Sequence, residues 1–206
     1  MSAISSAIQV LQSGAKDDPE QRDRYLGYIE DATARLERLL DALLVLARAQ
    51  SGEEEPAISL VPVEPVLLRS LDGVTARAGV ALETEVEPRL AAETNPRLLE
   101  QLLANLVANA AKHTDSGSIR IVASRENGRV AIEVRDTGHG LEPADAELIQ
   151  RELARHDAPE LDGLGIGLTI VREAVRALHG EVEIAPRRGG GTTARVVLAA
   201  ADGAAP

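Results

Sequence analysis

The sequence predicts an α+β fold: a two-layer α/β sandwich in which helices cover one face of a mixed sheet, preceded by an α-helical hairpin. Residues 3–50 show helical patterning throughout, whereas residues 57–200 mix strand and helix patterns. Most strands predicted in the second segment are joined to a sequence neighbour by a short turn, with helices between the pairs, which is typical of α+β domains. We therefore divide the chain into a helical hairpin at 1–50, a polar linker at 51–56, a mixed domain at 57–200 and a tail at 201–206.

The N-terminal segment carries the pattern of a helical bundle. Asp18, followed by Pro19 and Gln21, is a helix start of the capping type, and the helix is predicted to run to about Gln50. This helix carries an apolar seam of the coiled-coil type. A seam of this kind needs a partner helix, and the short apolar helix at 4–11 covers only part of it. A homodimer through residues 3–50 is predicted, and a hairpin packed against its own domain is the alternative. The seam recurs in steps of three and four residues: Ile29, Ala32, Leu36, Leu39, Leu43 and Leu46.

Composition limits the possible partners and compartments. Aliphatic side chains must build the core, because 44% of residues are hydrophobic but only 1% are aromatic. The absence of cysteine excludes disulfides and thiolate metal sites. A net charge of −11 without a basic patch argues against nucleic acid as a partner. No apolar run approaches the ~20 residues of a membrane helix, so we expect a cytoplasmic location and no membrane contact from this chain, with any anchor outside it.

Turn and capping signals mark the elements of the mixed domain. Asn95 followed by Pro96 is a helix start, because Asn caps free N–H groups and Pro suits the first turn. Asn127 followed by Gly128, between two alternating segments, is a strong hairpin signal. Gly180 is expected to close a helix. The predicted elements are, in order, strand 58–63, helix 66–76, strand 80–86, helix 95–113, strands 118–124 and 129–135, helix 168–178, and strands 181–185 and 193–199.

The helix at 95–113 carries a polar stripe beside its leucine-rich face. Gln101, Asn105, Asn109 and Lys112 are spaced by four, four and three residues, so they share one side of the helix. Asn is a poor helix former, and two of them one turn apart require a reason. An amide oxygen suits Mg²⁺, and a lysine one turn further on can meet a phosphate. The stripe alone is equally compatible with a solvated helix edge.

Two glycine-rich segments follow. Asp136, at a predicted strand end, can accept a hydrogen bond from an exocyclic amine, and Gly138 and Gly140 allow close approach; an ordinary Asp-x-Gly turn is the alternative. Residues 163–167 place three glycines before a helix, where free N–H groups favour phosphate. The residues before them resemble a loop rather than a strand, which argues against a dinucleotide fold, and the absence of Gly-Lys-Ser/Thr excludes a P-loop.

The order and spacing of these motifs resemble the ATPase fold shared by gyrase, heat-shock chaperones, mismatch-repair proteins and histidine kinases. Residues 105–114 are similar to the N box of sensor histidine kinases, and 136–140 and 163–167 to their two glycine boxes. The resemblance covers about residues 57–200 and implies ATP and Mg²⁺ as cofactors. It implies that Asn109 binds the metal, Lys112 touches phosphate and Asp136 reads adenine. It further implies a nucleotide site that includes Gly138, Gly140, Arg155, Gly163, Gly165, Gly167, Leu168 and Thr192, with His113 either beside the base or at the surface.

Asn105 indicates which branch of this fold the chain resembles. The hydrolytic relatives carry a Glu one turn before the metal-binding Asn, where it activates water. The amide of Asn105 cannot take a proton, which favours phosphoryl transfer over hydrolysis. We therefore predict catalytic roles for Asn105 and Lys112. The resemblance implies transfer of the γ-phosphoryl group to a histidine and then to an aspartate of a response regulator.

The chain departs from the family pattern in two places. Residues 18–22 and 36–44 resemble the second helix of the family's phosphotransfer hairpin, but residues 2–4 resemble the stretch just after the phosphoacceptor box. None of the four histidines lies in that context, so we expect ATP binding without phosphorylation of the usual His. Residues 143–157 align with the family's F box. Gln150 and Leu153 take its Phe positions, and Arg155 lies where a basic lid residue meets phosphate.

Three other functions share parts of this pattern. A non-catalytic, nucleotide-gated dimeric scaffold is compatible with the missing His and altered lid. A gyrase- or chaperone-type ATPase is disfavoured by Asn105. A serine kinase of the anti-sigma type shares the nucleotide site but would lack the helical hairpin.

Overall fold

The computed structural model describes residues 3–12, 18, 21–27, 29, 33, 57–74, 76–154 and 165–200. The chain divides into two compact units, Met1–Ser51 and Gly52–Pro206. Within the described residues, no helix combines the length and apolarity needed to cross a bilayer.

In the first unit, α1 spans Ala3–Gln12, and residues 21–27 are also helical. The predicted helix start at Asp18 is confirmed, because its carboxylate accepts hydrogen bonds from the backbone N and side-chain Nε2 of Gln21. Of the predicted seam, Ile29 is described and helical, and the other five positions lie outside the described residues. The dimer through this segment therefore stays a prediction.

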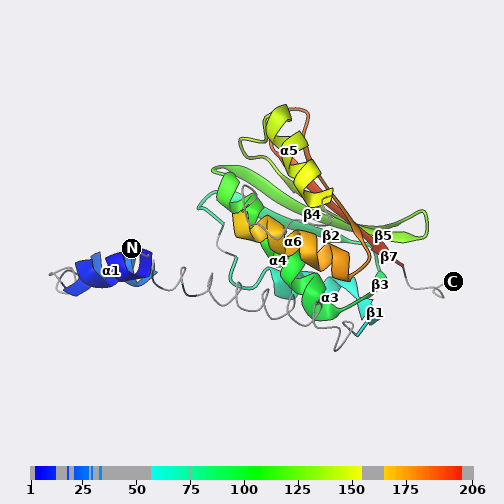
Figure 1. The fold of residues 1–206 in the computed structure, drawn as a ribbon, viewed down its shortest axis with the longest axis horizontal. Coiled ribbons are helices and arrows are strands. Elements are labelled where there is room, and N and C mark those ends of the chain that lie inside the picture. The colour runs from blue at the N-terminus through cyan, green and yellow to red at the C-terminus, as the bar shows by residue number, and fades with distance from the viewer. Residues whose placement is uncertain are drawn as a thin grey trace. The chain divides into compact units, whose positions relative to one another are not determined.

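The second unit is built on a five-stranded sheet of order β2-β4-β5-β7-β6 (Figure 1). The strand β2 runs parallel to β4, and the other neighbours are antiparallel, so the sheet is mixed as predicted. A separate antiparallel pair joins β1 to β3. The strands are β1 Ser59–Pro62, β2 Val80–Val86, β3 Ala91–Thr94, β4 Gly117–Glu126, β5 Arg129–Asp136, β6 Glu181–Pro186 and β7 Thr192–Ala199.

Helices pack on one face of this sheet, which confirms the predicted sandwich. The helix α4, Pro96–His113, contacts β4 and β5, and α6, Gly165–Ala177, contacts α4 and β6. The helix α3, Val63–Ser70, packs against α4. The core is aliphatic: Leu99, Leu102, Leu103, Ile119, Ile121, Val130, Ile132, Val196 and Leu198 have no exposed surface.

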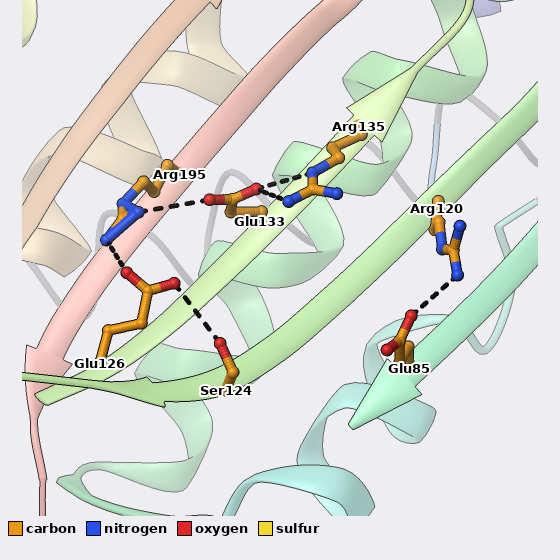
Figure 2. A network of polar contacts seen from close by, with 7 residues as sticks. All are labelled: Glu85, Arg120, Ser124, Glu126, Glu133, Arg135 and Arg195. Atoms are coloured by element: carbon orange, nitrogen blue, oxygen red, sulfur yellow. Dashed lines mark hydrogen bonds and ion pairs between the residues drawn. The ribbon is translucent and has the colours of Figure 1, made fainter. Parts of the chain in front are cut away.

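The opposite face of the sheet carries a network of ion pairs (Figure 2). Arg195 on β7 bridges Glu126 and Glu133 at 2.6 and 3.3 Å, and Arg135 contacts the same Glu133. Acidic and basic side chains are interleaved on this face, with Glu133 and Arg135 both on β5 and Arg195 on β7, so each charge has an opposite partner nearby. Each such pair contributes only about 0–1 kcal/mol, so the network indicates a solvated face rather than a second core.

The helix α4 follows its sequence signals closely. The side chain of Asn95 accepts hydrogen bonds from the backbone N of Arg97 and Leu98, and Pro96 takes the first helical position. The helix ends at His113 as predicted. Buried leucines fix its rotation, so the polar stripe is placed at a defined edge.

Other boundaries differ from the prediction. The helix α3 begins at Val63 rather than Val66, because Pro65 falls in the first turn, where its missing N–H costs nothing. The helix α6 begins at Gly165 rather than Leu168, which places Gly165 and Gly167 in its first turn. The strand β3 was not predicted, since four residues with two alanines carry little strand signal.

The F-box segment forms α5, Pro143–Ala154, anchored to the sheet edge. The amide of Gln150 donates to Val182 O and accepts from Ile184 N, both at 3.1 Å. Because β6 is an edge strand, this side chain occupies backbone groups that would otherwise be unpaired. Leu153 is 7% exposed. At the two Phe positions of the family's box, this chain therefore has Gln150, which bonds to the edge strand β6, and Leu153, which is buried.

The C-terminus of α6 confirms that Gly180 closes the helix, and it places the left-handed residue one position earlier. The backbone N of Gly180 bonds to Val175 O, and that of His179 to Arg176 O, which is a Schellman motif with His179 in the left-handed position at φ 50°. Gly180 is needed for another reason: a Cβ there would lie 2.8 Å from Leu198 Cδ2 and 2.9 Å from Val197 O.

His179→Gly is therefore expected to raise the free energy of unfolding by about 1 kcal/mol, because Gly adopts the left-handed conformation without a Cβ clash. Thermal unfolding of the variant and the unmodified chain measures the difference. Gly180→Ala, the matched control, should lower stability through its contact with β7. A loss of stability in His179→Gly would contradict the assignment.

Candidate functional site

Asp136, the last residue of β5, is the centre of the site. It is 5% exposed, and its Oδ1 accepts hydrogen bonds from Gly138 N at 2.9 Å and Thr192 N at 3.1 Å. Among the described residues, no hydrogen bond falls on Oδ2. The backbone thus holds one carboxylate oxygen in place and leaves the other as an acceptor for a ligand.

The loop between β6 and β7 closes directly on Asp136. Arg187 Nη1 donates to Asp136 O at 2.5 Å. Gly191 has φ +86°, and a Cβ there would lie 2.0 Å from the same carbonyl oxygen. A Cβ on Gly140 would in turn lie 3.1 Å from Gly191 O. Gly191 was not among the predicted site residues, although a run of three glycines before Thr192 exceeds what a hairpin turn requires.

The first glycine segment also packs on the C-terminal end of α4. A Cβ on Gly138 would lie 2.0 Å from His113 O, and the backbone N of His139 donates to that oxygen at 3.3 Å. The end of β5 is thereby joined to the end of α4. This contact brings Asp136 to the same region as His113 and Lys112.

His113 and His139 form a hydrogen-bonded pair. Nδ1 of His113 lies 3.0 Å from Nε2 of His139, and the rings meet edge to face at 88°. Partial burial, followed by the charges of Lys112 and His139, lowers the pKa of His113 below its usual value of 6.5, and Asp136 acts in the opposite direction. His113 is therefore largely neutral at about pH 7. His139 was predicted only as part of a glycine turn, and nothing in the local sequence indicates the pairing.

The asparagine stripe faces the first turn of α6. Asn105 is 7% exposed, and its Nδ2 donates to Gln101 O at 2.8 Å, so the alternative of a solvated edge is wrong for this residue. A Cβ on Gly167 would lie 3.3 Å from Asn105 Oδ1 and 3.4 Å from Asn109 Oδ1. Lys112 is exposed and has no ion-pair partner among the described residues.

The predicted site residues thus fall into two groups connected by α4. The first group lies where α4 crosses α6 and consists of Asn105, Asn109 and Gly167. The second group lies at the C-terminal end of α4 and consists of His113, Asp136, Gly138, Gly140 and Thr192. Leu168 is half-buried in α6, and Gly165 lies in its first turn. Arg155 and Gly163 lie outside the described residues.

A helix-covered mixed sheet, with an anchored carboxylate at a strand end and glycine segments against an asparagine-bearing helix, defines an ATP-binding domain of the α/β sandwich class. Comparison with protein families supports this class. Residues 94–202 match the model described as histidine kinase-, DNA gyrase B- and HSP90-like ATPase, and residues 1–52 match the His Kinase A (phospho-acceptor) domain.

Comparisons with individual proteins narrow the class. The sensor histidine kinase MtrB of Mycobacterium leprae is 31% identical over 96% of this chain and 36% of its own length. The autoinducer 2 sensor kinase/phosphatase LuxQ of Vibrio harveyi is 35% identical over 98% and 25%. The solved structure of full-length ShkA in complex with AMPPNP is 30% identical, with a TM-score of 0.65 over 91% of this chain and 40% of that one.

The chain belongs to the sensor histidine kinase family, and its second unit is the ATP-binding core. It spans about a quarter to a third of the length of these curated relatives. Acinetobacter baumannii AdeS, at 18% identity and a TM-score of 0.68, shares the fold.

Proposed function

We propose that the site binds ATP with Mg²⁺ and that the protein transfers the γ-phosphoryl group to a histidine and then to an aspartate of a response regulator. The observation that carries this proposal is the Asp136 carboxylate, held through Oδ1 by two backbone N–H groups and open at Oδ2. An acceptor fixed in this way suits the exocyclic amine of adenine. The family match supports the same reaction class.

A single amide ligand fits Mg²⁺ at this position. Within the described part of the chain, no group of three or more His, Cys, Asp or Glu side chains could hold a metal. Mg²⁺ ordinarily keeps several waters and binds through one or two protein oxygens together with substrate phosphates. Asn109, whose Oδ1 faces the first turn of α6, supplies such an oxygen. The bound metal would neutralise charge on the phosphates.

The remaining residues position the nucleotide and carry little acid–base chemistry. Lys112, exposed and without an ion-pair partner among the described residues, is free to approach a phosphate. Asn105 is an amide that donates to Gln101 O, so it cannot serve as the base that activates water. Phosphoryl transfer depends mainly on positioning and charge neutralisation, which these groups supply. Family resemblance also suggests that Arg155 contacts a phosphate and that Thr192 lies near the adenine base.

The assembly is proposed from the first unit. The apolar seam, which repeats every seven residues, and the match to a His Kinase A domain support a homodimer through residues 3–50. The response regulator is the expected protein partner. We also propose a cytoplasmic location, because a kinase of this kind needs access to cellular ATP.

Asp136→Asn tests the proposal. The amide oxygen can still accept from Gly138 N and Thr192 N, but an N–H₂ group then replaces Oδ2 and faces the adenine amine. Affinity for a non-hydrolysable ATP analogue with Mg²⁺, measured by calorimetry, should fall about tenfold to a hundredfold, or ~1–3 kcal/mol. Asp115→Asn is the matched control: this exposed residue pairs with Arg77 at the surface, and affinity should change less than about twofold.

Two outcomes would overturn the proposal. Absence of Mg²⁺-dependent nucleotide binding in the unmodified chain would favour a dimeric scaffold. Steady ATP turnover without a phosphoacceptor would favour an ATPase of the gyrase or chaperone type.

A further inference from the structure

We propose that His139 is a positioning residue that sets the ring tautomer of His113, so that neutral His113 offers Nε2 as a hydrogen-bond acceptor to the bound nucleotide. The proposal rests on the proposed function and deepens it, because it assigns a specificity role to the pair beside the nucleotide site.

The tautomers follow from one contact. Nδ1 of His139 lies 2.9 Å from Gly140 O, and a carbonyl oxygen only accepts, so Nδ1 carries the proton. Nε2 of a neutral His139 is then bare. It lies 3.0 Å from His113 Nδ1, which must therefore be the donor. A neutral His113 that is protonated at Nδ1 has a bare Nε2.

The backbone holds His139 in this position. Its N–H donates to His113 O at 3.3 Å, and Gly138 lets the loop approach because a Cβ there would lie 2.0 Å from that oxygen. Main chain and ring of His139 thus both contact His113. His139 therefore holds the ring of His113, at the end of α4, from a position 26 residues further along the chain.

The open nitrogen belongs to the region of the proposed nucleotide site. His113 is exposed, follows Lys112 directly, and lies close enough to Asp136 for that carboxylate to act on its pKa. Among the described residues, neither ring has a further hydrogen-bond partner. His113 Nε2 and Asp136 Oδ2 are therefore two acceptors in one region, which favours a ligand rich in donors, such as an amino-purine nucleoside.

Charge at the pair supports the neutral form. The groups that act on His113 are Lys112 and His139, which lower its pKa, and Asp136, which raises it; burial is the largest cause and also lowers it. Because the pKa is lowered, the neutral tautomer persists below the usual pKa of 6.5. Protonation at lower pH converts Nε2 from an acceptor into a donor.

The first test reads the tautomer directly, without nucleotide. Long-range ¹H–¹⁵N NMR of the full chain at about pH 7.5 should show His113 protonated at Nδ1. In His139→Leu, which removes the acceptor, His113 should shift towards protonation at Nε2. His139→Gln places an amide oxygen near the lost Nε2 and should restore the Nδ1 form. Protonation of His113 at Nε2 in the unmodified chain would overturn the proposal.

The second test reads specificity. His139→Leu should weaken a non-hydrolysable ATP analogue about fivefold to tenfold, and the inosine analogue, which carries a carbonyl in place of the amine, by less than about twofold. His139→Gln should recover most of the loss, and His179→Gln, in the turn that follows α6, should show none. Equal losses for both nucleotides would overturn the specificity role. Failure of the unmodified chain to bind any nucleotide would instead refute the proposed function and leave the NMR result standing.

Discussion

Gly191→Ala is expected to lower the free energy of unfolding by about 3 kcal/mol and to abolish most nucleotide binding. The new Cβ would lie 2.0 Å from Asp136 O and 2.7 Å from its carbonyl carbon, and the residue is held at φ +86°. Neither neighbour is a flexible side-chain end, so the loop or the end of β5 must move. That movement would separate Thr192 N from Asp136 Oδ1 and release the carboxylate.

Gly189→Ala is the matched control for this prediction. It has a similar φ of +93° but nothing within 4 Å of the added Cβ. Its cost is the left-handed conformation alone, about 1 kcal/mol, and nucleotide affinity should be retained. Denaturant unfolding and calorimetric titration of both variants measure the difference. Equal stability losses would show that the contact with Asp136 does not contribute.

Asn109→Ala is the second substitution for which we expect a large effect, here on nucleotide affinity and on phosphoryl transfer. If Asn109 supplies the protein oxygen for Mg²⁺, its removal should lower affinity for the Mg²⁺–nucleotide complex about tenfold or more, while binding without metal changes little. Phosphoryl transfer to a phosphoacceptor hairpin supplied in trans should fall about a hundredfold or more, because charge neutralisation at the phosphates is lost.

Asn109→Asp distinguishes the metal role from a packing role. A carboxylate keeps the oxygen ligand and is nearly the same size, so Mg²⁺-dependent binding should persist. Retention of the full Mg²⁺ effect in Asn109→Ala would remove Asn109 as the metal ligand.

The three motifs were visible in the sequence because each lies within one short segment. The polar stripe repeats at helical spacing on α4, and the two glycine segments stand beside a predicted strand end and a predicted helix start. Their order along the chain was enough to indicate the family and ATP. The distances between them required the structure, because they depend on how α4, α6 and β5 pack.

The sequence by itself determined most of the helices and strands and their order, because their start and turn signals lie within a few neighbouring residues. Asn95 caps α4 through bonds to residues two and three positions away, and Asn127 and Gly128 take φ values of 50° and 74° in the β4–β5 turn. Such signals are contained in a few neighbouring residues, so the elements and their order can be predicted from them.

Only the tertiary structure decided the contacts that join distant segments. Thr192 reaches Asp136 across 56 positions, and His139 reaches His113 across 26. A glycine at 191 or 180 looks like an ordinary turn residue until the backbone that presses against it is placed. The physical reason is that a hydrogen bond or a close approach depends on where the folded core brings two strands or helices, and no local propensity encodes that position.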